Sequence, residues 1–275
     1  MPTKTALVTG ASSGIGEATA LKLQERGYTV YGAARRTDRL HKLAERGIRP
    51  LAMDVTDDAS MQAGIDQTTA ETGRIDALVN IAGYGSYGAL EDVPLDEARY
   101  QFEVNVFGAI RLTQLALPHM RAQHFGTVVN ITSMGGKIYT PLGGWYHGTK
   151  FALEALSDCL RLEAKPFGID VVVIEPGGIA TEWAPSPPTS WKVLRPRRLR
   201  RPGRRCRLLP ALRGQRQAQL PALRHRRRHR QGRHRPPPQD PLRQGFGARP
   251  LIALRRVLPD RAFDAVISRA VGLPR

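Results

Sequence analysis

Short apolar runs alternate with longer amphipathic stretches from the N-terminus to about residue 182. Six of these runs predict strands, at 5–9, 29–33, 51–53, 77–81, 127–131 and 171–174. Unbroken apolar runs are typical of strands whose two faces are both covered by helices. Because helical stretches separate the runs, the pattern predicts parallel β-α-β units in a doubly wound α/β sheet.

Two of the amphipathic stretches predict long helices. The first spans 95–123, and the second spans 145–163. In the helix predicted at 145–163, the spacing of the apolar residues places three leucines on the core side, Leu153, Leu156 and Leu160. Ligands of open α/β sheets bind at the carboxyl ends of the strands, so we expect the functional site there.

The amphipathic pattern is interrupted once, over residues 185–245. This segment holds 18 Arg, one Lys and one acidic residue, which accounts for the whole formal net charge of +18. It also holds 11 of the 21 prolines and shows neither helical nor strand periodicity, so we expect no core from it. Amphipathic sequence resumes at 246–275, where Pro259-Asp260 predicts a helix start.

The composition of this segment suggests its origin. Arg, Pro, Leu, Ala, Gln and His with almost no acids is what GC-rich coding DNA gives when it is read out of frame. We therefore hypothesise either a disordered segment or two compensating frameshifts, near Pro185 and near Gly245. The predicted organisation is a single domain with its core at 1–184, the Arg/Pro-rich segment at 185–245 and a helical tail at 246–275.

Such a basic segment also has binding interpretations. An arginine-rich arm could hold nucleic acid through phosphate charge, but Trp191 is the segment's single aromatic residue for base stacking. Its prolines interrupt any membrane-surface helix, and its histidines lack the second shell of a metal site. We therefore expect no nucleic-acid, membrane or metal partner.

The compartment is indicated by cysteine usage and by the N-terminus. Two cysteines, Cys159 and Cys206, give no disulfide framework, which favours a reducing compartment. The first predicted strand begins without a basic and apolar leader, and no apolar run approaches the ~20 residues of a membrane span. We expect a soluble, cytoplasmic protein.

The first predicted strand leads into a glycine-rich turn, Gly10-Ala-Ser12-Ser13-Gly14-Ile15-Gly16, and then into a helix. Gly10 permits the tight turn, Gly14 lets the backbone approach a pyrophosphate, and Gly16 allows close helix packing. The positive N-terminus of the helix would stabilise the phosphates. This pattern predicts a dinucleotide-binding turn.

Ser133, Tyr146 and Lys150 form a candidate catalytic trio. At positions i and i+4 of the predicted helix, the Tyr146 hydroxyl and the Lys150 ammonium can point into one pocket. A free phenol titrates at about 10, and a nearby cation favours tyrosinate, so we expect a lowered pKa for Tyr146. Ser133 adds a hydroxyl that can bind a carbonyl oxygen. The trio indicates a reductase.

In order and spacing, the glycine-rich turn, Asn80-Ile-Ala-Gly83, Asn105, the trio and Pro176-Gly177 resemble the short-chain dehydrogenase/reductase family. The resemblance spans residues 3 to about 182. One departure is Ile81, where the family usually has a second Asn. The resemblance implies a Rossmann fold and a substrate lid in the region that the Arg/Pro-rich segment occupies.

The resemblance also implies roles for the candidate residues. Ser133 would hold the substrate oxygen, Tyr146 would exchange its proton, and Lys150 would bind the nicotinamide ribose. Asn105 would anchor a water-mediated proton relay. The cofactor-binding residues would be Gly10, Ser12, Ser13, Gly14, Ile15, Gly16, Arg35, Arg36, Asp54, Val55, Asn80, Ala82, Gly83, Tyr146, Lys150, Pro176, Gly177, Ile179 and Thr181. The family is usually oligomeric, so the resemblance further implies a homo-oligomer.

The end of the second predicted strand indicates which cofactor is bound. An NAD enzyme would place an acid there, but Arg35 and Arg36 follow instead. Guanidinium suits a ribose 2′-phosphate, so we expect NADP rather than NAD. A solvated arginine pair is the alternative. Ser13 stands where some family members carry a second basic residue, so the prediction depends on the two arginines.

The sequence thus predicts an NADP-dependent oxidoreductase that acts on a small-molecule alcohol or ketone, with Tyr146 as general acid and base. Apolar residues near the expected site indicate a hydrophobic substrate: Met134, Tyr139, Leu142 and Trp145. Three alternatives stay open, namely a cofactor-binding protein without turnover, an arginine-rich nucleic-acid-binding protein, and a reductase inactivated by the change of frame.

Overall fold

The computed structural model describes residues 3–179, 242–244 and 248–271. Thr181, which the sequence assigned to the cofactor site, lies outside these ranges, as do residues 185–241 of the Arg/Pro-rich segment. Over the described part of the core, strands and helices alternate as the apolar pattern predicts.

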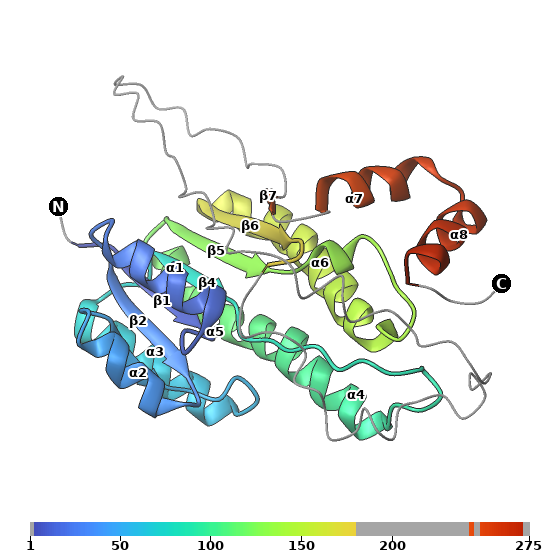
Figure 1. Ribbon diagram of the computed structural model, residues 1–275. Helices are drawn as coiled ribbons and strands as arrows, with labels where there is room; N and C mark the ends of the chain where they lie inside the picture. The colour runs from blue at the N-terminus through green and yellow to red at the C-terminus, as the bar shows by residue number, and fades with distance from the viewer. Residues whose placement is uncertain (1–2, 180–241, 245–247, 272–275) are drawn as a thin grey trace.

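A seven-stranded parallel sheet forms the centre of the protein, in the order β3-β2-β1-β4-β5-β6-β7 (Figure 1). The strands are β1 (Thr5–Thr9), β2 (Thr29–Ala34), β3 (Arg49–Ala52), β4 (Ala77–Asn80), β5 (Gly126–Ile131), β6 (Ile169–Pro176) and β7 (Leu242–Gln244). All six predicted strands are confirmed, and with them the doubly wound Rossmann-type fold. The strand order reverses between β1 and β4, so a ligand is expected at their carboxyl ends.

β7 lies inside the Arg/Pro-rich segment, whose sequence shows no strand periodicity, so this strand was not predicted. β7 pairs in parallel with β6, where Ile174 lies opposite Leu242 and Pro176 opposite Gln244. Backbone hydrogen bonds define a strand this short, and they need no apolar run that the sequence would reveal. β7 covers the carboxyl-terminal part of the β6 edge.

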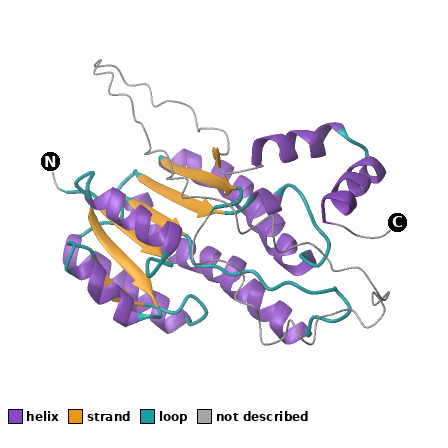
Figure 2. Ribbon diagram, viewed as in Figure 1, coloured by secondary structure: helices purple, strands orange, loops and turns teal. Residues whose placement is uncertain are grey.

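Helices cover both faces of the sheet (Figure 2). On one face lie α1 (Gly14–Gln24) and α2 (Thr37–Ala44), which bury Ala20, Leu40 and Leu43. On the other lie α3 (Asp58–Thr72), α5 (Gly108–Ala122) and α6 (Gly144–Ala164), which bury Met61, Ile65, Leu112, Ala116, Met120 and Ala164. Each fully buried large aliphatic side chain contributes about 1.5–3 kcal/mol, so these two layers hold the strands in place.

One long helical stretch crosses the carboxyl edge of the sheet. α4 (Leu95–Phe102) continues through a π-helical turn (Glu103–Phe107) into α5, as the pattern over 95–123 predicts. The π turn contains the buried Asn105. Such turns are frequent at functional sites, because the extra residue in the turn re-aims the side chains.

The core face of α6 differs from the prediction at one position. Leu153 is buried and Leu160 packs partly against the core, as expected. Leu156 is 41% exposed, so its predicted core position is wrong. It lies at the border of the apolar face, where solvent reaches the side chain.

The predicted helical tail forms α7 (Ala248–Val257) and α8 (Asp260–Val271). The tail packs on the loop after β5, and the shared cluster buries Ile138, Ile252, Phe263 and Ile267. The Tyr139 ring lies edge-on to Phe263 with centroids 5.5 Å apart, and its hydroxyl donates to Asp264 Oδ1 at 3.0 Å. The tail therefore braces the loop between Ser133 and Tyr146.

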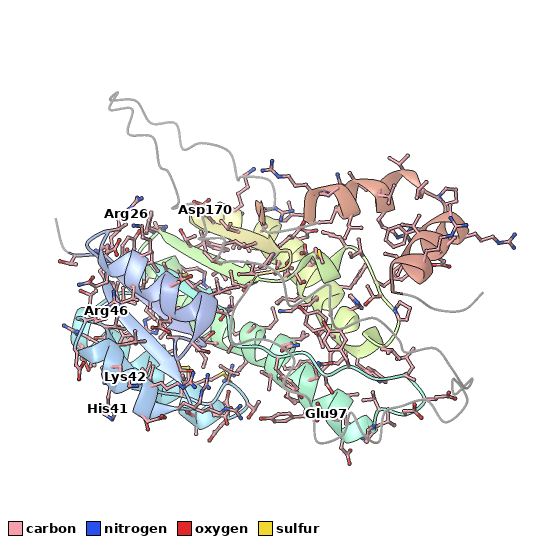
Figure 3. The ribbon with its side chains drawn as sticks, in the orientation of Figure 1. Arg26, His41, Lys42, Arg46, Glu97 and Asp170 are labelled. Carbon is pink, nitrogen blue, oxygen red and sulfur yellow. The ribbon has the colours of Figure 1, made fainter. Side chains whose placement is uncertain are left out.

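Charged side chains lie on the outside of the α1 and α2 layer. Arg26, His41, Lys42 and Arg46 are exposed and extend away from the sheet (Figure 3). None of the helices within 3–179 and 248–271 has the length and apolar character that crossing a membrane requires.

Candidate active site

The glycine-rich turn joins β1 to α1 at the centre of the sheet. Gly10 and Gly14 have φ angles of +65° and +57°, a backbone conformation that other residues rarely adopt. A Cβ on Gly16 would lie 2.1 Å from the Gly10 carbonyl oxygen, so α1 begins in direct contact with the turn. Ile15 lies in the first turn of α1, whose N–H groups attract anions. The turn therefore fits a pyrophosphate.

The loop after β4 packs against this turn. A Cβ on Gly10 would lie 2.9 Å from the Ala82 nitrogen. Thr9 Oγ1 accepts hydrogen bonds from the N–H groups of Ile81 and Ala82, at 3.0 and 3.1 Å. Because backbone atoms make these contacts, the Ile81 departure from the family pattern leaves them intact. Asn80 Nδ2 donates to Asn130 Oδ1 at 2.8 Å, which ties β4 to β5.

Arg36 and two serines of the turn converge on one point. Arg36 Nη2 donates to Ser12 Oγ and to Ser13 Oγ, each at 3.0 Å. A guanidinium beside two hydroxyls is a donor set that suits a phosphate group. The sequence analysis assigned Ser13 to the cofactor site but did not predict its hydrogen bond with Arg36.

Arg35 has different partners from Arg36. Its Nη1 donates to the Tyr100 hydroxyl of α4 at 2.8 Å and lies 3.8 Å from Asp54 Oδ2. Asp54 Oδ1 accepts from the N–H and hydroxyl of Thr56, which fixes the carboxylate after β3. The next residue, Val55, packs partly against the core. Arg35 and Asp54 thus border the turn from the β3 side.

Ser133, Tyr146 and Lys150 come together at the carboxyl end of β5. Lys150 Nζ donates to the Ile131 carbonyl oxygen at 3.0 Å and lies 6.0 Å from the centre of the Tyr146 ring. The Ser133 side chain hydrogen-bonds to Tyr146 and accepts the Gly135 N–H at 3.0 Å. All three side chains of the predicted trio therefore share one site.

Burial dominates the acidity of Tyr146. It raises the pKa of Tyr146 to about 12, and the hydrogen bond with Ser133 opposes this rise only in part. The prediction that the pKa of Tyr146 is lowered is therefore wrong. Burial also lowers the pKa of Lys150 to about 8, although the charge of Glu154 works against that change.

Asn105 connects the loop after β4 to α6. Its Oδ1 accepts the Tyr84 N–H at 2.9 Å, and its Nδ2 donates to the Tyr84 carbonyl at 2.8 Å and to the Thr149 hydroxyl at 3.1 Å. A Cβ on Gly83 would lie 3.0 Å from Asn105 Oδ1, so the loop approaches closely. The side chain therefore fixes two walls of the site, and the proton relay at Asn105 stays a prediction.

Pro176 ends β6, and Gly177 and Ile179 follow it at the same edge of the sheet. Pro176 is buried, and Gly177 and Ile179 are partly buried. Within the ranges that the structure describes, no three His, Cys, Asp or Glu side chains group closely enough to hold a metal ion.

Tyr87, which the sequence analysis did not name, borders Tyr146, and Leu142, which it placed near the substrate, contacts the loop that carries Tyr87. The Tyr87 ring lies 5.5 Å from the Tyr146 ring, centroid to centroid. Leu142, with a φ of +67° that is strained for leucine, accepts the Gly88 N–H at 2.7 Å and so joins the two loops. An aromatic residue in a glycine-rich loop after a buried strand was the available signal for Tyr87.

Met134 and Tyr139 are partly buried and pack against the cluster formed with the helical tail. Part of their apolar surface therefore attaches α7 and α8. That these two residues, Leu142 and Trp145 line a substrate site stays a prediction.

His147 fixes the loop that precedes α6. Its Nε2 accepts the Thr140 N–H at 3.0 Å. A backbone N–H can only donate, so Nδ1 carries the ring proton and donates to the Gly135 carbonyl at 2.9 Å. A second proton on the ring would break the bond to Thr140.

Acidification should therefore destabilise the protein through His147. Burial lowers the pKa of His147, so the folded state binds the proton less readily than the unfolded state. The contribution to the free energy of unfolding is complete above the unfolded pKa of about 6.5 and is lost as the pH falls below it. We expect the Tm to fall more steeply between about pH 7 and pH 5 in the wild type than in His147→Gln. Equal slopes would contradict this role.

Comparison with known proteins places these motifs in a family. The family model described as short chain dehydrogenase matches residues 4–189. The chain is 40% identical over 176 residues to the 3-ketodihydrosphingosine reductase of Bacteroides thetaiotaomicron, covering 64% of each chain. It is 37% identical over 186 residues to the NADPH-dependent 3-dehydrocapnine reductase of Ornithobacterium rhinotracheale, covering 64% of this chain and 66% of the relative. The matched part is therefore slightly less than two thirds of either relative.

A solved structure agrees with both the sequence match and the sheet. The short-chain dehydrogenase from Streptomyces avermitilis superposes with a TM-score of 0.64 and 43% identity, covering 65% of this chain and 67% of that one. The matched residues of the family model include the glycine-rich turn, the candidate catalytic trio and β6. The chain therefore belongs to the short-chain dehydrogenase/reductase family.

Proposed function

We propose that this protein is an NADP-dependent oxidoreductase that transfers a hydride between nicotinamide and a carbonyl or secondary alcohol. The observation that carries the proposal is the shared site of Ser133, Tyr146 and Lys150 at the carboxyl end of β5. An acid, a second hydroxyl and a cation in one buried place are the groups that polarising and protonating a carbonyl requires.

The chain's own residues move the proton. A substrate oxygen between the hydroxyls of Ser133 and Tyr146 would accept a hydrogen bond from each. Tyr146 would donate its proton to that oxygen during reduction and recover it during oxidation. Burial favours the protonated phenol, which is the form that reduction needs. The Lys150 ammonium, held on the Ile131 carbonyl, would stabilise the tyrosinate that is left.

A nicotinamide dinucleotide fits the first half of the site. The turn at Gly10 and Gly16 has no room for a side chain, and α1 begins directly beside it. Arg36 with Ser12 and Ser13 forms a donor group for the 2′-phosphate that distinguishes NADP from NAD. Bound there, the cofactor would supply or accept the hydride.

Arg36→Ala should remove the preference for NADPH. A charged hydrogen bond contributes about 1.5–3 kcal/mol, so the affinity for NADPH should fall roughly 10- to 100-fold while that for NADH changes little. Thermal melts with each cofactor at equal concentration measure this, because the stabilisation by a ligand grows with the logarithm of its affinity. Arg46→Ala, which removes an exposed arginine outside the site, is the matched control. If Arg36→Ala keeps the wild-type difference between cofactors, Arg36 does not bind the 2′-phosphate.

We propose a hydrophobic ketone or alcohol as the substrate. The Tyr87 ring borders the catalytic phenol, Leu142 is bonded to the loop that carries Tyr87, and the name of one relative describes the reduction of a 3-keto compound. A panel of alkyl and aryl ketones with NADPH tests the class. Turnover of small polar substrates alone would reject it.

We also propose a homo-oligomer. Large apolar side chains are exposed on the π turn and on α6, at Phe107 (54%), Phe151 (43%) and Leu162 (71%). The family resemblance implies contacts through these helices, and such contacts would remove this apolar surface from water.

A further inference from the structure

A cluster of four charged side chains lies behind the catalytic trio. Lys150 and Glu154 come from α6, Lys137 from the loop after β5, and Glu175 from β6. Lys150, Glu154 and Glu175 are 7%, 3% and 0% exposed, and the Lys137 side chain is 28% exposed. Charged residues are seldom buried to this extent unless they are paired. We refer to these four residues as the buried charge cluster.

Direct contacts hold the carboxylates of the cluster. Lys137 Nζ lies 3.0 Å from Glu154 Oε2 and 4.0 Å from Glu175 Oε1. The Thr132 hydroxyl donates to Glu154 Oε1 at 2.6 Å. A Cβ on Gly136 would lie 2.9 Å from Glu154 Cγ and 3.0 Å from the Lys150 carbonyl oxygen, so the loop after β5 packs tightly on α6 here. Glu154 therefore has a fixed position.

The cluster contains two cations and two carboxylates, so its net charge is zero when all four groups are ionised. Lys137 lies near both carboxylates, and Lys150 is the second cation. Tyr146, Lys150 and Glu154 follow one another at intervals of four residues, so they share one face of α6. Two other neighbours of the Lys150 ammonium are uncharged, namely the Tyr146 phenol ring and the Ile131 carbonyl. Glu154 is thus the carboxylate closest along the helix to the catalytic ammonium.

We propose that Glu154 is a positioning residue whose carboxylate, held by Thr132 and Lys137, keeps Lys150 in its ammonium form. This inference rests on the proposed oxidoreductase function, in which Lys150 acts as a cation. Burial lowers the pKa of Lys150 to about 8 even though Glu154 raises it, so Lys150 has little margin at neutral pH. Burial also raises the pKa of Glu154, and Thr132 and Lys137 oppose that rise.

Two substitutions at Glu154 separate its charge from its packing. Glu154→Gln keeps an oxygen that can accept from Thr132 but removes the charge, and should lower the pKa of Lys150. Glu154→Asp keeps the charge on a shorter side chain and should leave the pKa of Lys150 near its wild-type value. A purely structural disturbance has no reason to spare the variant that keeps the charge. Glu163→Gln, at an exposed position of α6, is the control and should leave the pKa unchanged.

The direct measurement is an NMR titration of the full chain with lysines labelled at Cε and Nζ. The Lys150 signal is identified by its absence from Lys150→Arg. A lowered pKa in Glu154→Gln together with a near-wild-type pKa in Glu154→Asp supports the proposal, and an unchanged pKa in Glu154→Gln or equal falls in both variants overturn it. If Glu154→Gln does not fold, Glu154→Asp alone decides, because a pKa of Lys150 well below the wild-type value contradicts the proposal.

A second measurement connects the cluster to turnover. In Glu154→Gln, the fall in NADPH-dependent reduction at alkaline pH should move to lower pH, with the KM for the ketone little changed. An unshifted pH profile in an active variant would overturn the catalytic part of the proposal. A wild type without reductase activity would refute the proposed function, whereas the NMR titration would still decide whether Glu154 controls Lys150.

Discussion

Tyr146→Phe should abolish reduction of any ketone that the wild type accepts. The substitution removes only the hydroxyl, so the ring keeps its contact with Tyr87 and its place on α6. General acid catalysis contributes about 100- to 10,000-fold, and we expect kcat to fall by at least that factor. Steady-state rates of NADPH oxidation measure the loss, and NADPH fluorescence should show an unchanged cofactor affinity.

Tyr87→Phe is the matched control for Tyr146→Phe. It removes a phenol hydroxyl from the neighbouring ring, whose pKa burial also raises. Loss of this hydroxyl should change kcat far less than loss of the Tyr146 hydroxyl. Equal losses in both variants, or a Tyr146→Phe protein with more than about a tenth of wild-type kcat, would refute the assignment of Tyr146 as the proton donor.

Gly16→Ala should have the second large effect, on both folding and cofactor binding. The added methyl group would lie 2.1 Å from the Gly10 carbonyl oxygen and 3.1 Å from Ala11 Cα, and both neighbours are backbone atoms that cannot rotate away. α1 must move away from the turn, at a cost of about 1–3 kcal/mol in the free energy of unfolding. We expect a Tm lowered by several degrees and an NADPH affinity reduced more than roughly 10-fold.

Gly148→Ala separates this clash from the general effect of a glycine substitution. Gly148 also lies in a helix, but its Cβ would meet Phe102 at 3.7 Å, an ordinary contact. Replacing a helical glycine by alanine gains about 1 kcal/mol in helix propensity, so this variant should be at least as stable as the wild type. A Gly16→Ala protein that melts and binds NADPH like the wild type would show that α1 does not need its close contact with the turn.

The strands and the long helices could be predicted because their signals are local. An apolar run such as 77–81 specifies a buried strand without reference to its neighbours. β7 could not be predicted, because its three residues form a strand only through pairing with β6. Leu156 was misplaced for a related reason, since helical spacing gives the direction of a face but not how far its cover extends.

The site residues could be predicted by type and order, but not their environment. The sequence places Tyr146 and Lys150 one helical turn apart, and from this spacing we expected the cation to lower the pKa of the phenol. The opposite direction results from the depth of burial, which depends on how the loops after β4 and β5 close over α6. Likewise, Arg35 and Arg36 are adjacent in sequence, but only the fold directs one to Tyr100 and the other to Ser12.

The attachment of the helical tail to the loop after β5 has a consequence for the order of folding. Tyr139 and Asp264 are 125 residues apart in sequence, yet they share a hydrogen bond at 3.0 Å. Contacts of such long range form late, because closing the intervening chain costs entropy before any contact is gained. During synthesis, the loop that carries Ser133 toward Tyr146 can reach its final packing only after α8 has left the ribosome. The sheet can therefore form as far as β6 before the loop between Ser133 and Tyr146 is packed against α7 and α8.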